Sequence, residues 1–201
     1  MRKINEIFYS LQGEGHHTGY PSVFVRFSGC NLECPFCDTT HEEGIMMSDN
    51  DIIRAINLYS ARWIVLTGGE PTLHIDEEFI RTLKRATGKL VAVETNGTRP
   101  VPPSVDWVCV SPKTGIDGIP DSSSEIRAAH ADEIKVVDVG QPLEAYFSLP
   151  CRDEKTLMYL QPCYVADEKR FERNRLHTVQ RVLADPRWTL SLQTHRYLNI
   201  P

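Results

Sequence analysis

The chain has 201 residues, a formal net charge of −5 and a pI of about 5.8, with 41% hydrophobic and 24% charged residues. This composition is ordinary for a globular protein, and the length suits one domain over residues 1–201. The acidic balance and the lack of a long Lys/Arg run argue against nucleic acid as a direct partner. No apolar run approaches the roughly 18 residues that span a bilayer, and the N-terminus lacks a secretion signal. We therefore expect a cytoplasmic protein without a membrane partner.

Short, nearly continuous apolar segments rich in Val, Ile and Leu recur along the chain. This pattern is typical of parallel strands that are buried on both faces. The predicted strands cover residues 22–27, 63–67, 90–94, 106–111, 133–139, 156–161 and 189–193.

Three of the connections between these strands predict long helices. Their apolar sides consist of Ile52, Ile56 and Tyr59 after a Ser48 N-cap; of Ile75, Phe79, Leu83 and Ala86; and of Phe171, Leu176, Val179 and Leu183 within 167–185. Residues 95–105 contain three prolines and predict no helix, while 112–124 predict a loop followed by at most a short helix around 125–130. A complete eight-unit barrel usually needs about 250 residues. We therefore predict an α/β fold, an incomplete TIM-type barrel of about six parallel strands and three main helices.

Three cysteines lie close together directly after the first predicted strand. Cys30, Cys34 and Cys37 have the spacing C-x3-C-x2-C within the loop 28–41. Thiolates three or four residues apart on a curled loop can converge on one metal centre. Since disulfides are rare in the cytoplasm, we interpret the cysteines as metal ligands and buried thiols.

Two kinds of metal centre fit this loop. A structural zinc ion needs four protein ligands, and the fourth would have to be His41 or one of the distant cysteines Cys109, Cys151 and Cys163. A [4Fe–4S] cluster on three cysteines would instead leave one iron open to a ligand that is not protein, which is typical of a catalytic site. A chance group of free thiols is the remaining alternative. The spacing, together with the motifs below, favours the open cluster.

The segment GCNLECPFC (29–37) resembles the cluster loop of the radical S-adenosylmethionine superfamily. The resemblance implies that Cys30, Cys34 and Cys37 hold a [4Fe–4S] cluster, whose fourth iron binds the amino and carboxylate groups of S-adenosylmethionine. It also implies that Phe36 and Asp38 contact this cosubstrate, with Phe36 near the adenine.

Further motifs lie just past the ends of predicted strands: LTGGEP (66–71), ETNGT (94–98), SPK (111–113) and LQP (160–162). Each alone is a common way to end a strand in a turn. In a parallel barrel, however, ligands gather at the carboxyl ends of the strands, so the motifs together indicate one binding rim. The resemblance implies that S-adenosylmethionine contacts Gly68, Gly69, Glu70, Glu94, Asn96, Ser111, Lys113 and Gln161.

The flanks of the cysteine loop are more specific than the loop itself. SLQGEG (10–15), FVRF (24–27) and CDT (37–39), with the closing SLQTHRYLNIP (191–201), resemble the 7-carboxy-7-deazaguanine synthase family. The resemblance implies a carbon–nitrogen lyase that converts 6-carboxy-5,6,7,8-tetrahydropterin to 7-carboxy-7-deazaguanine with loss of ammonia, for queuosine-type nucleosides. It also implies reduced flavodoxin or ferredoxin as electron donor, and a homodimer.

The same resemblance assigns roles to individual residues. Arg26 should bind the substrate carboxylate through its planar guanidinium, although by itself it would be an ordinary strand-end arginine. Thr39 should be a ligand of Mg²⁺, an ion that keeps waters and binds substrate oxygens. His195, on its own a packing histidine, should contact the pterin. The other implied pterin contacts are Leu11, Gln12, Gly13, Glu14, Thr67 and Pro201.

Two rival functions remain open at this point. Activases of glycyl-radical enzymes have a similar cluster loop, but they lack the Gln-Gly-Glu and Cys-Asp-Thr flanks and act on a protein partner. A zinc-binding module without catalytic activity is the second rival. It predicts a colourless zinc protein, whereas the radical enzyme is expected to be brown and oxygen-sensitive.

Overall fold

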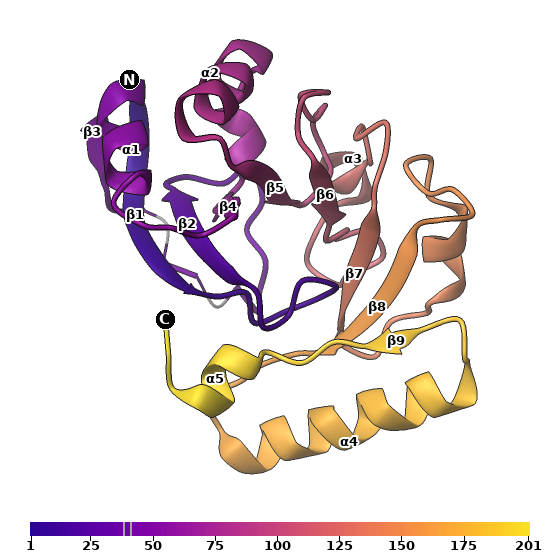
Figure 1. Cartoon of the computed structure of the whole chain (residues 1–201). Coiled ribbons are helices and arrows are strands. Elements are labelled where there is room, and N and C mark those ends of the chain that lie inside the picture. The colour runs from indigo at the N-terminus through magenta and orange to yellow at the C-terminus, as the bar shows by residue number, and fades with distance from the viewer. Residues whose placement is uncertain (38, 41) are drawn as a thin grey trace.

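The computed structural model describes residues 1–37, 39–40 and 42–201. One sheet runs through the chain in the strand order β3-β1-β2-β4-β5-β6-β7-β8-β9 (Figure 1). The strands are β1 (Arg2–Leu11), β2 (Pro21–Phe27), β3 (Ile45–Met47), β4 (Trp63–Gly68), β5 (Leu90–Thr95), β6 (Trp107–Val110), β7 (Glu133–Asp138), β8 (Leu157–Pro162) and β9 (Thr189–Leu190).

From β2 onward, neighbouring strands in the sheet are parallel, whereas β1 is antiparallel to both β2 and β3. The curved sheet is an incomplete barrel, which confirms the predicted fold class. The antiparallel strands β1 and β3 lie outside the predicted strands, and β9 keeps only two of the five residues predicted for it.

The three predicted long helices are present as α1 (Asp49–Ile56), α2 (Glu77–Thr87) and α4 (Glu168–Ala184). Ser48 forms a capping box with Asp51 at the start of α1, and Asp76 accepts a hydrogen bond from the Phe79 amide at the start of α2. The shorter helices are α3 (Asp121–Ser124), α5 (Thr194–Leu198) and the 3₁₀ turns η1 (Pro71–Leu73) and η2 (Glu144–Ser148). The short helix expected around 125–130 thus lies earlier in the chain. No helix in the described ranges is both long and apolar enough to cross a membrane.

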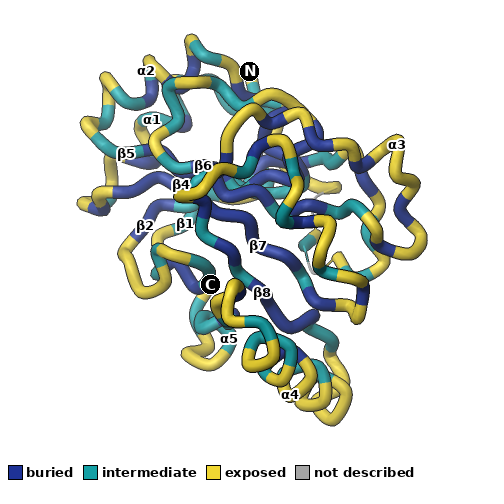
Figure 2. The backbone as a smooth tube through the Cα atoms, turned by 90° about the vertical axis from the view of Figure 1, so that its right-hand side faces the viewer, coloured by how far each residue is buried: buried dark blue, intermediate teal, exposed yellow. Residues whose placement is uncertain are grey.

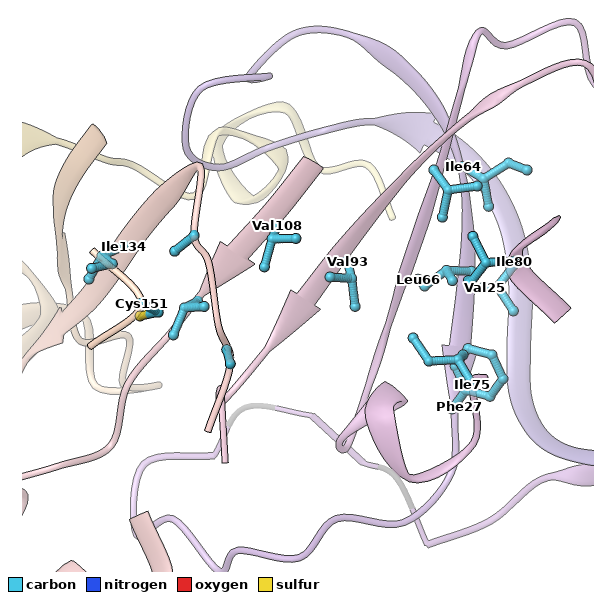
Figure 3. Close-up of a cluster of buried hydrophobic side chains, with 14 of the residues drawn as sticks. Val25, Phe27, Ile64, Leu66, Ile75, Ile80, Val93, Val108, Ile134 and Cys151 are labelled. Atoms are coloured by element: carbon cyan, nitrogen blue, oxygen red, sulfur yellow. The ribbon is translucent and has the colours of Figure 1, made fainter. Parts of the chain in front are cut away.

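The apolar core lies between the outer face of the sheet and the helices that cover it. Val25, Phe27, Ile64 and Leu66 alternate with residues of the inner face, and they pack with Ile80 of α2 (Figure 3). All five are completely or almost completely buried. Because this face carries the hydrophobic packing, the inner face is available for polar side chains.

Helix α4 packs with a different side than its sequence predicts. Leu176 and Leu183, two residues of the predicted apolar side, are 59% and 80% exposed. The buried side is polar: Thr178 and Arg181 both bond to Asp138 at the end of β7. The helix is therefore oriented by a buried carboxylate, and Figure 2 shows its outward turns exposed.

This orientation predicts a large and a small effect on the free energy of unfolding for two substitutions that lie two residues apart in α4. Arg181→Met leaves the fully buried Asp138 carboxylate without its cation, so the free energy of unfolding should fall by about 3 kcal/mol. Leu183→Ala should change it by less than about 0.5 kcal/mol, because that side chain lies in solvent. Urea unfolding followed by circular dichroism measures both. A larger loss for Leu183→Ala would contradict the orientation.

Candidate active site

The inner face of the sheet carries polar residues in rows that run across neighbouring strands. Arg26 of β2 is in register with Thr67 of β4. Glu94 of β5 is in register with Cys109 of β6, which is in register with Glu133 of β7. Parallel register therefore places functional side chains from distant segments at one level of the barrel.

One cavity of about 330 Å³ follows this inner face. Its lining combines the cysteine loop, the rim motifs and the segments on either side of them in the sequence. The predicted site residues that line it are Leu11, Gln12, Gly13, Glu14, Arg26, Cys30, Cys34, Phe36, Cys37, Thr39, Thr67, Gly68, Gly69, Glu94, Asn96, Ser111, Lys113, Gln161, His195 and Pro201. Asp38 and His41, named above as a cosubstrate contact and an alternative zinc ligand, lie outside the described residues.

The cysteine loop leaves the end of β2 and curls over the cavity. The Cys37 amide donates to the Cys34 carbonyl at 3.0 Å, which forms a turn between two of the thiols. Cys30 and Cys34 are half-buried and Cys37 is exposed. Burial raises the pKa of the Cys30 and Cys34 thiols, and each neighbouring thiolate raises it further, while the Lys113 ammonium lowers that of Cys34. Three thiolates in one loop therefore need a cationic centre.

The separation of the thiols distinguishes the two kinds of metal centre. Three thiolates on one tetrahedral zinc ion lie about 3.8 Å apart, since each Zn–S bond is about 2.3 Å. Within the described ranges, the one group of three Cys, His or carboxylate ligand atoms that all lie within 4.8 Å of one another is Glu94, Cys109 and Glu133. The loop cysteines form no such group. The three thiols are therefore not placed to bind one zinc ion together.

The Gly-Gly-Glu-Pro turn after β4 is joined to the start of the cysteine loop. The Gly69 amide donates to the Phe27 carbonyl at 3.2 Å, and the Glu70 amide donates to the Gly29 carbonyl at 2.9 Å. A Cβ atom added at Gly69 would overlap the Gly29 carbonyl and touch Cys30. Glycine is therefore needed here for the close approach of two backbones that carry the site.

Glu70 is fully buried and lies outside the cavity lining. Its carboxylate accepts hydrogen bonds from the amide and hydroxyl of Thr72, the hydroxyl of Thr95 and the amide of Asn96. The side chain thus links the ends of β4 and β5 and supports the rim. Its expected contact with a cosubstrate remains a prediction.

The other rim residues are held by short polar contacts. Asn96 donates to the Asn31 side chain at 3.0 Å, which connects β5 to the cysteine loop. Lys113 donates to the carbonyl and hydroxyl of Ser111 at 2.7 Å each. Burial lowers the pKa of Lys113, against the attraction of nearby acidic groups. Gln161 accepts from the Ser191 hydroxyl at 2.8 Å.

The loop between β1 and β2, residues 12–20, extends toward β7 (Figure 1), and its residues Gln12, Gly13 and Glu14 line the cavity. The Thr194 amide donates to the Gly13 carbonyl at 2.9 Å, and a Cβ added at Gly13 would overlap the His195 ring. The C-terminal segment is therefore packed directly against the Gln-Gly-Glu turn. Pro201 also accepts a hydrogen bond from Ser10 at 2.8 Å.

Arg26 reaches into the cavity from the middle of the sheet. Its Nε donates to Glu6 at 2.7 Å, and its guanidinium lies over the Phe8 ring. A contact through Nε orients the guanidinium while directing its two terminal nitrogens elsewhere. That geometry suits two-point binding of a carboxylate.

Several lining residues are absent from the sequence-based prediction, including Phe8, Phe24, Lys135, Gln193 and Arg196. The sequence does indicate Lys135 as a candidate, because it places a cation inside an otherwise apolar predicted strand. In the loop between β1 and β2, the centroid of the His17 ring lies 4.4 Å from that of Trp63 and 4.6 Å from that of Trp107. Burial lowers the pKa of His17.

Comparisons with known proteins agree with this geometry. The sequence model described as "Radical SAM superfamily" matches residues 24–120, which include the cysteine loop and the Gly-Gly-Glu-Pro turn. Three clustered cysteines above an incomplete parallel barrel are thus the site of a radical S-adenosylmethionine enzyme.

Full-length relatives identify the family within this class. A 7-carboxy-7-deazaguanine synthase from Bacteroides thetaiotaomicron is 50% identical over 200 residues, covering 100% of this chain and 99% of the relative. Another from Neisseria meningitidis is 36% identical over 98% of this chain and 93% of its own length. The crystal structure of QueE from Escherichia coli superposes with a TM-score of 0.73 at 29% identity, covering 96% and 93% of the two chains. The chain belongs to the 7-carboxy-7-deazaguanine synthase family.

The close approach at Gly69 gives a prediction for the cysteine loop. Gly69→Ala should push the loop away from the rim and lower the rate of S-adenosylmethionine cleavage by about tenfold or more, because the reacting groups lose their alignment. Gly140→Ala is the control, since no atom lies near its added Cβ and Gly140 is outside the cavity lining; its positive φ, which Gly69 lacks, adds only local backbone strain. Release of 5′-deoxyadenosine, with iron content, is the measurement. Equal rates for the two variants would contradict the role of Gly69.

Proposed function

We propose that this chain converts 6-carboxy-5,6,7,8-tetrahydropterin to 7-carboxy-7-deazaguanine with loss of ammonia, in the biosynthesis of queuosine-type nucleosides. The observation that carries the proposal is that one cavity joins the cysteine loop to the Gln-Gly-Glu turn and Arg26. A radical generated at one end of such a cavity reaches a bound pterin without leaving the protein.

The residues of the cysteine end suit a cluster and its cosubstrate. Cys30, Cys34 and Cys37 would hold the [4Fe–4S] cluster, which on reduction cleaves S-adenosylmethionine and supplies a 5′-deoxyadenosyl radical. The residues that would bind S-adenosylmethionine are Phe36, Asp38, Gly68, Gly69, Glu70, Glu94, Asn96, Ser111, Lys113 and Gln161. Lys113 is a cation close to Cys34, so it is suited to bind the carboxylate of S-adenosylmethionine.

The other end offers groups complementary to a carboxylated pterin. Glu14 offers a carboxylate and Gln12 an amide, and these groups are complementary to the edge of the pterin ring that carries N–H donors and a carbonyl acceptor. Arg26, already oriented by Glu6, would bind the substrate carboxylate at two points. His195, packed against Gly13, would contact the same ring system, together with Leu11, Thr67 and Pro201.

Thr39 would complete a Mg²⁺ site that is shared with the substrate, because one hydroxyl needs waters and substrate oxygens beside it. Thr39→Val should raise the Mg²⁺ concentration for half-maximal turnover by about tenfold, and chelation of Mg²⁺ should lower the wild-type rate. The measurement is the rate of product formation against Mg²⁺ concentration. Identical curves for the two proteins would exclude Thr39 as a ligand.

A reduced flavodoxin or ferredoxin in the cytoplasm would supply the electron. The exposure of Cys37 supports this, since a cluster held there lies near the surface. A homodimer is supported by the exposed apolar side chains of α5, Tyr197 and Leu198. Sedimentation of the wild-type chain tests this, because a monomer at micromolar concentration would exclude a stable dimer.

The proposed reaction is tested directly by anaerobic reconstitution with iron, sulfide, S-adenosylmethionine, Mg²⁺, dithionite and 6-carboxytetrahydropterin. Mass spectrometry should detect 7-carboxy-7-deazaguanine and 5′-deoxyadenosine, and Cys34→Ala should abolish both because the cluster loses a ligand. Cys151→Ala is the control, since Cys151 is buried away from the cavity. Formation of 5′-deoxyadenosine with unchanged pterin would overturn the substrate, and an intact, reducible cluster without either product would overturn the reaction.

A further inference from the structure

Lys135 is a buried cation at the centre of the cavity wall. It lies on β7, is 4% exposed, and lines the cavity. Its Nζ is 2.7 Å from Glu14 Oε2 and 2.9 Å from Glu94 Oε2. Two carboxylates from opposite parts of the barrel, the loop after β1 and the end of β5, therefore meet at one ammonium group.

The contacts continue from Lys135 to the rest of the Gln-Gly-Glu turn. Glu94 accepts from Gln12 Nε2 through its second oxygen at 3.0 Å, and the Gln12 carbonyl oxygen accepts from the Glu14 amide at 3.3 Å. Gln193 donates to the second oxygen of Glu14 at 2.8 Å. Both side chains of the turn are thus oriented through Lys135, one directly and one through Glu94.

We propose that Lys135 is a positioning residue for the pterin: it holds Glu14 and, through Glu94, Gln12 in the orientation that binds the N–H donors of the substrate. This inference deepens the proposed function and rests on it. Each carboxylate oxygen has a second lone pair, so Glu14 can accept from the substrate while it remains bonded to Lys135 and Gln193.

The charges around Glu14 explain why a cation is needed. Lys135 of β7 and His195 of α5 act on Glu14, while Glu94 of β5 and Glu133 of β7 act on Lys135. Burial raises the pKa of Glu14, but Lys135, Gln193 and His195 together lower it to about 2. Burial acts against the charge of Lys135, yet Cys109 and the surrounding carboxylates raise its pKa above the usual range. Glu14 is consequently an anion at neutral pH.

Loss of the cation should alter the pH dependence of pterin binding. In Lys135→Met the effect of burial on Glu14 is no longer offset by that cation, so the pKa of Glu14 should rise, and a protonated Glu14 no longer accepts from the pterin at that oxygen. The apparent KM for the pterin should rise at least about tenfold at pH 7 relative to wild type at the same pH. The ratio of the two KM values should fall as the pH rises toward 9 and Glu14 ionises again.

A structural role alone would not produce this pattern. The KM for S-adenosylmethionine should rise less than the KM for the pterin, because Lys135 reaches the proposed cosubstrate residues through Glu94 but holds Glu14 directly. Lys89→Met is the matched control: Lys89 also donates two hydrogen bonds, to the Tyr59 and Ala61 carbonyls, but lies outside the cavity. It should keep a pH-independent ratio of pterin KM values near 1. A ratio that is independent of pH in Lys135→Met, or an equal rise in both KM values, would overturn the proposal.

Three further variants keep the test decisive. Lys135→Arg retains the cation and should keep the wild-type pH profile. Glu14→Gln should raise the pterin KM without pH dependence, and Lys135→Met/Glu14→Gln should lose less than the sum of the two single losses, because part of the effect of the lysine passes through that carboxylate. Additive losses in the double variant would overturn the inference.

The failure of the inference is distinguishable from failure of the proposed function. A wild-type enzyme that forms 5′-deoxyadenosine but leaves the pterin unchanged would overturn both. A Glu14→Gln variant with unchanged pterin KM would remove Glu14 as a substrate contact, and the inference with it. Impaired Glu14→Gln beside unimpaired Lys135→Met would overturn the inference alone.

Discussion

The fold depends on how its open barrel is closed. β1 pairs with β3 only at residues 2–4, and the loop that follows β1 crosses to the other side of the barrel. There the Gly15 amide donates to Ser191, the His16 amide donates to Glu133 of β7, and the Thr194 amide donates to the Gly13 carbonyl. The two segments joined by these bonds also line the cavity, through Gly13 and Glu14 on one side and Gln193 and His195 on the other.

The two faces of the sheet carry different kinds of side chain, because alternate residues of each strand lie on opposite sides. The outer face carries Val25, Phe27, Ile64 and Leu66, and its burial supplies most of the hydrophobic stabilisation. The inner face buries carboxylates and a lysine, which costs solvation free energy that ion pairs only partly offset. Charges that are buried beside a cavity at this cost are held in fixed positions, which is typical of a functional site.

The sequence predicts the parts of this molecule that follow local rules. Buried parallel strands, capped helices and the cysteine spacing all depend on residues near one another in the chain, and these are confirmed. The orientation of α4 depends on Asp138, forty residues away, so its apolar pattern gave the wrong face. The grouping of Lys135 with Glu14 depends on strand register, which local patterns leave undetermined. Gly69 is an intermediate case: the Gly-Gly-Glu-Pro motif is visible in the sequence, but the contact of Gly69 with Gly29 joins distant parts of the chain.

The polar network holds the side chains of the proposed substrate end in place before a ligand binds. A radical must be kept from water and from other side chains, so its partner should be fixed at several points before the radical forms. Arg26, Gln12 and Glu14 lie on different segments, and each is held in place by another protein group: Glu6, Glu94 and Lys135. Preorganised contacts reduce the ordering that binding would otherwise require. The proposed substrate end is thus held by groups outside the cysteine loop, and Glu94 is the residue through which it connects with the proposed cosubstrate end.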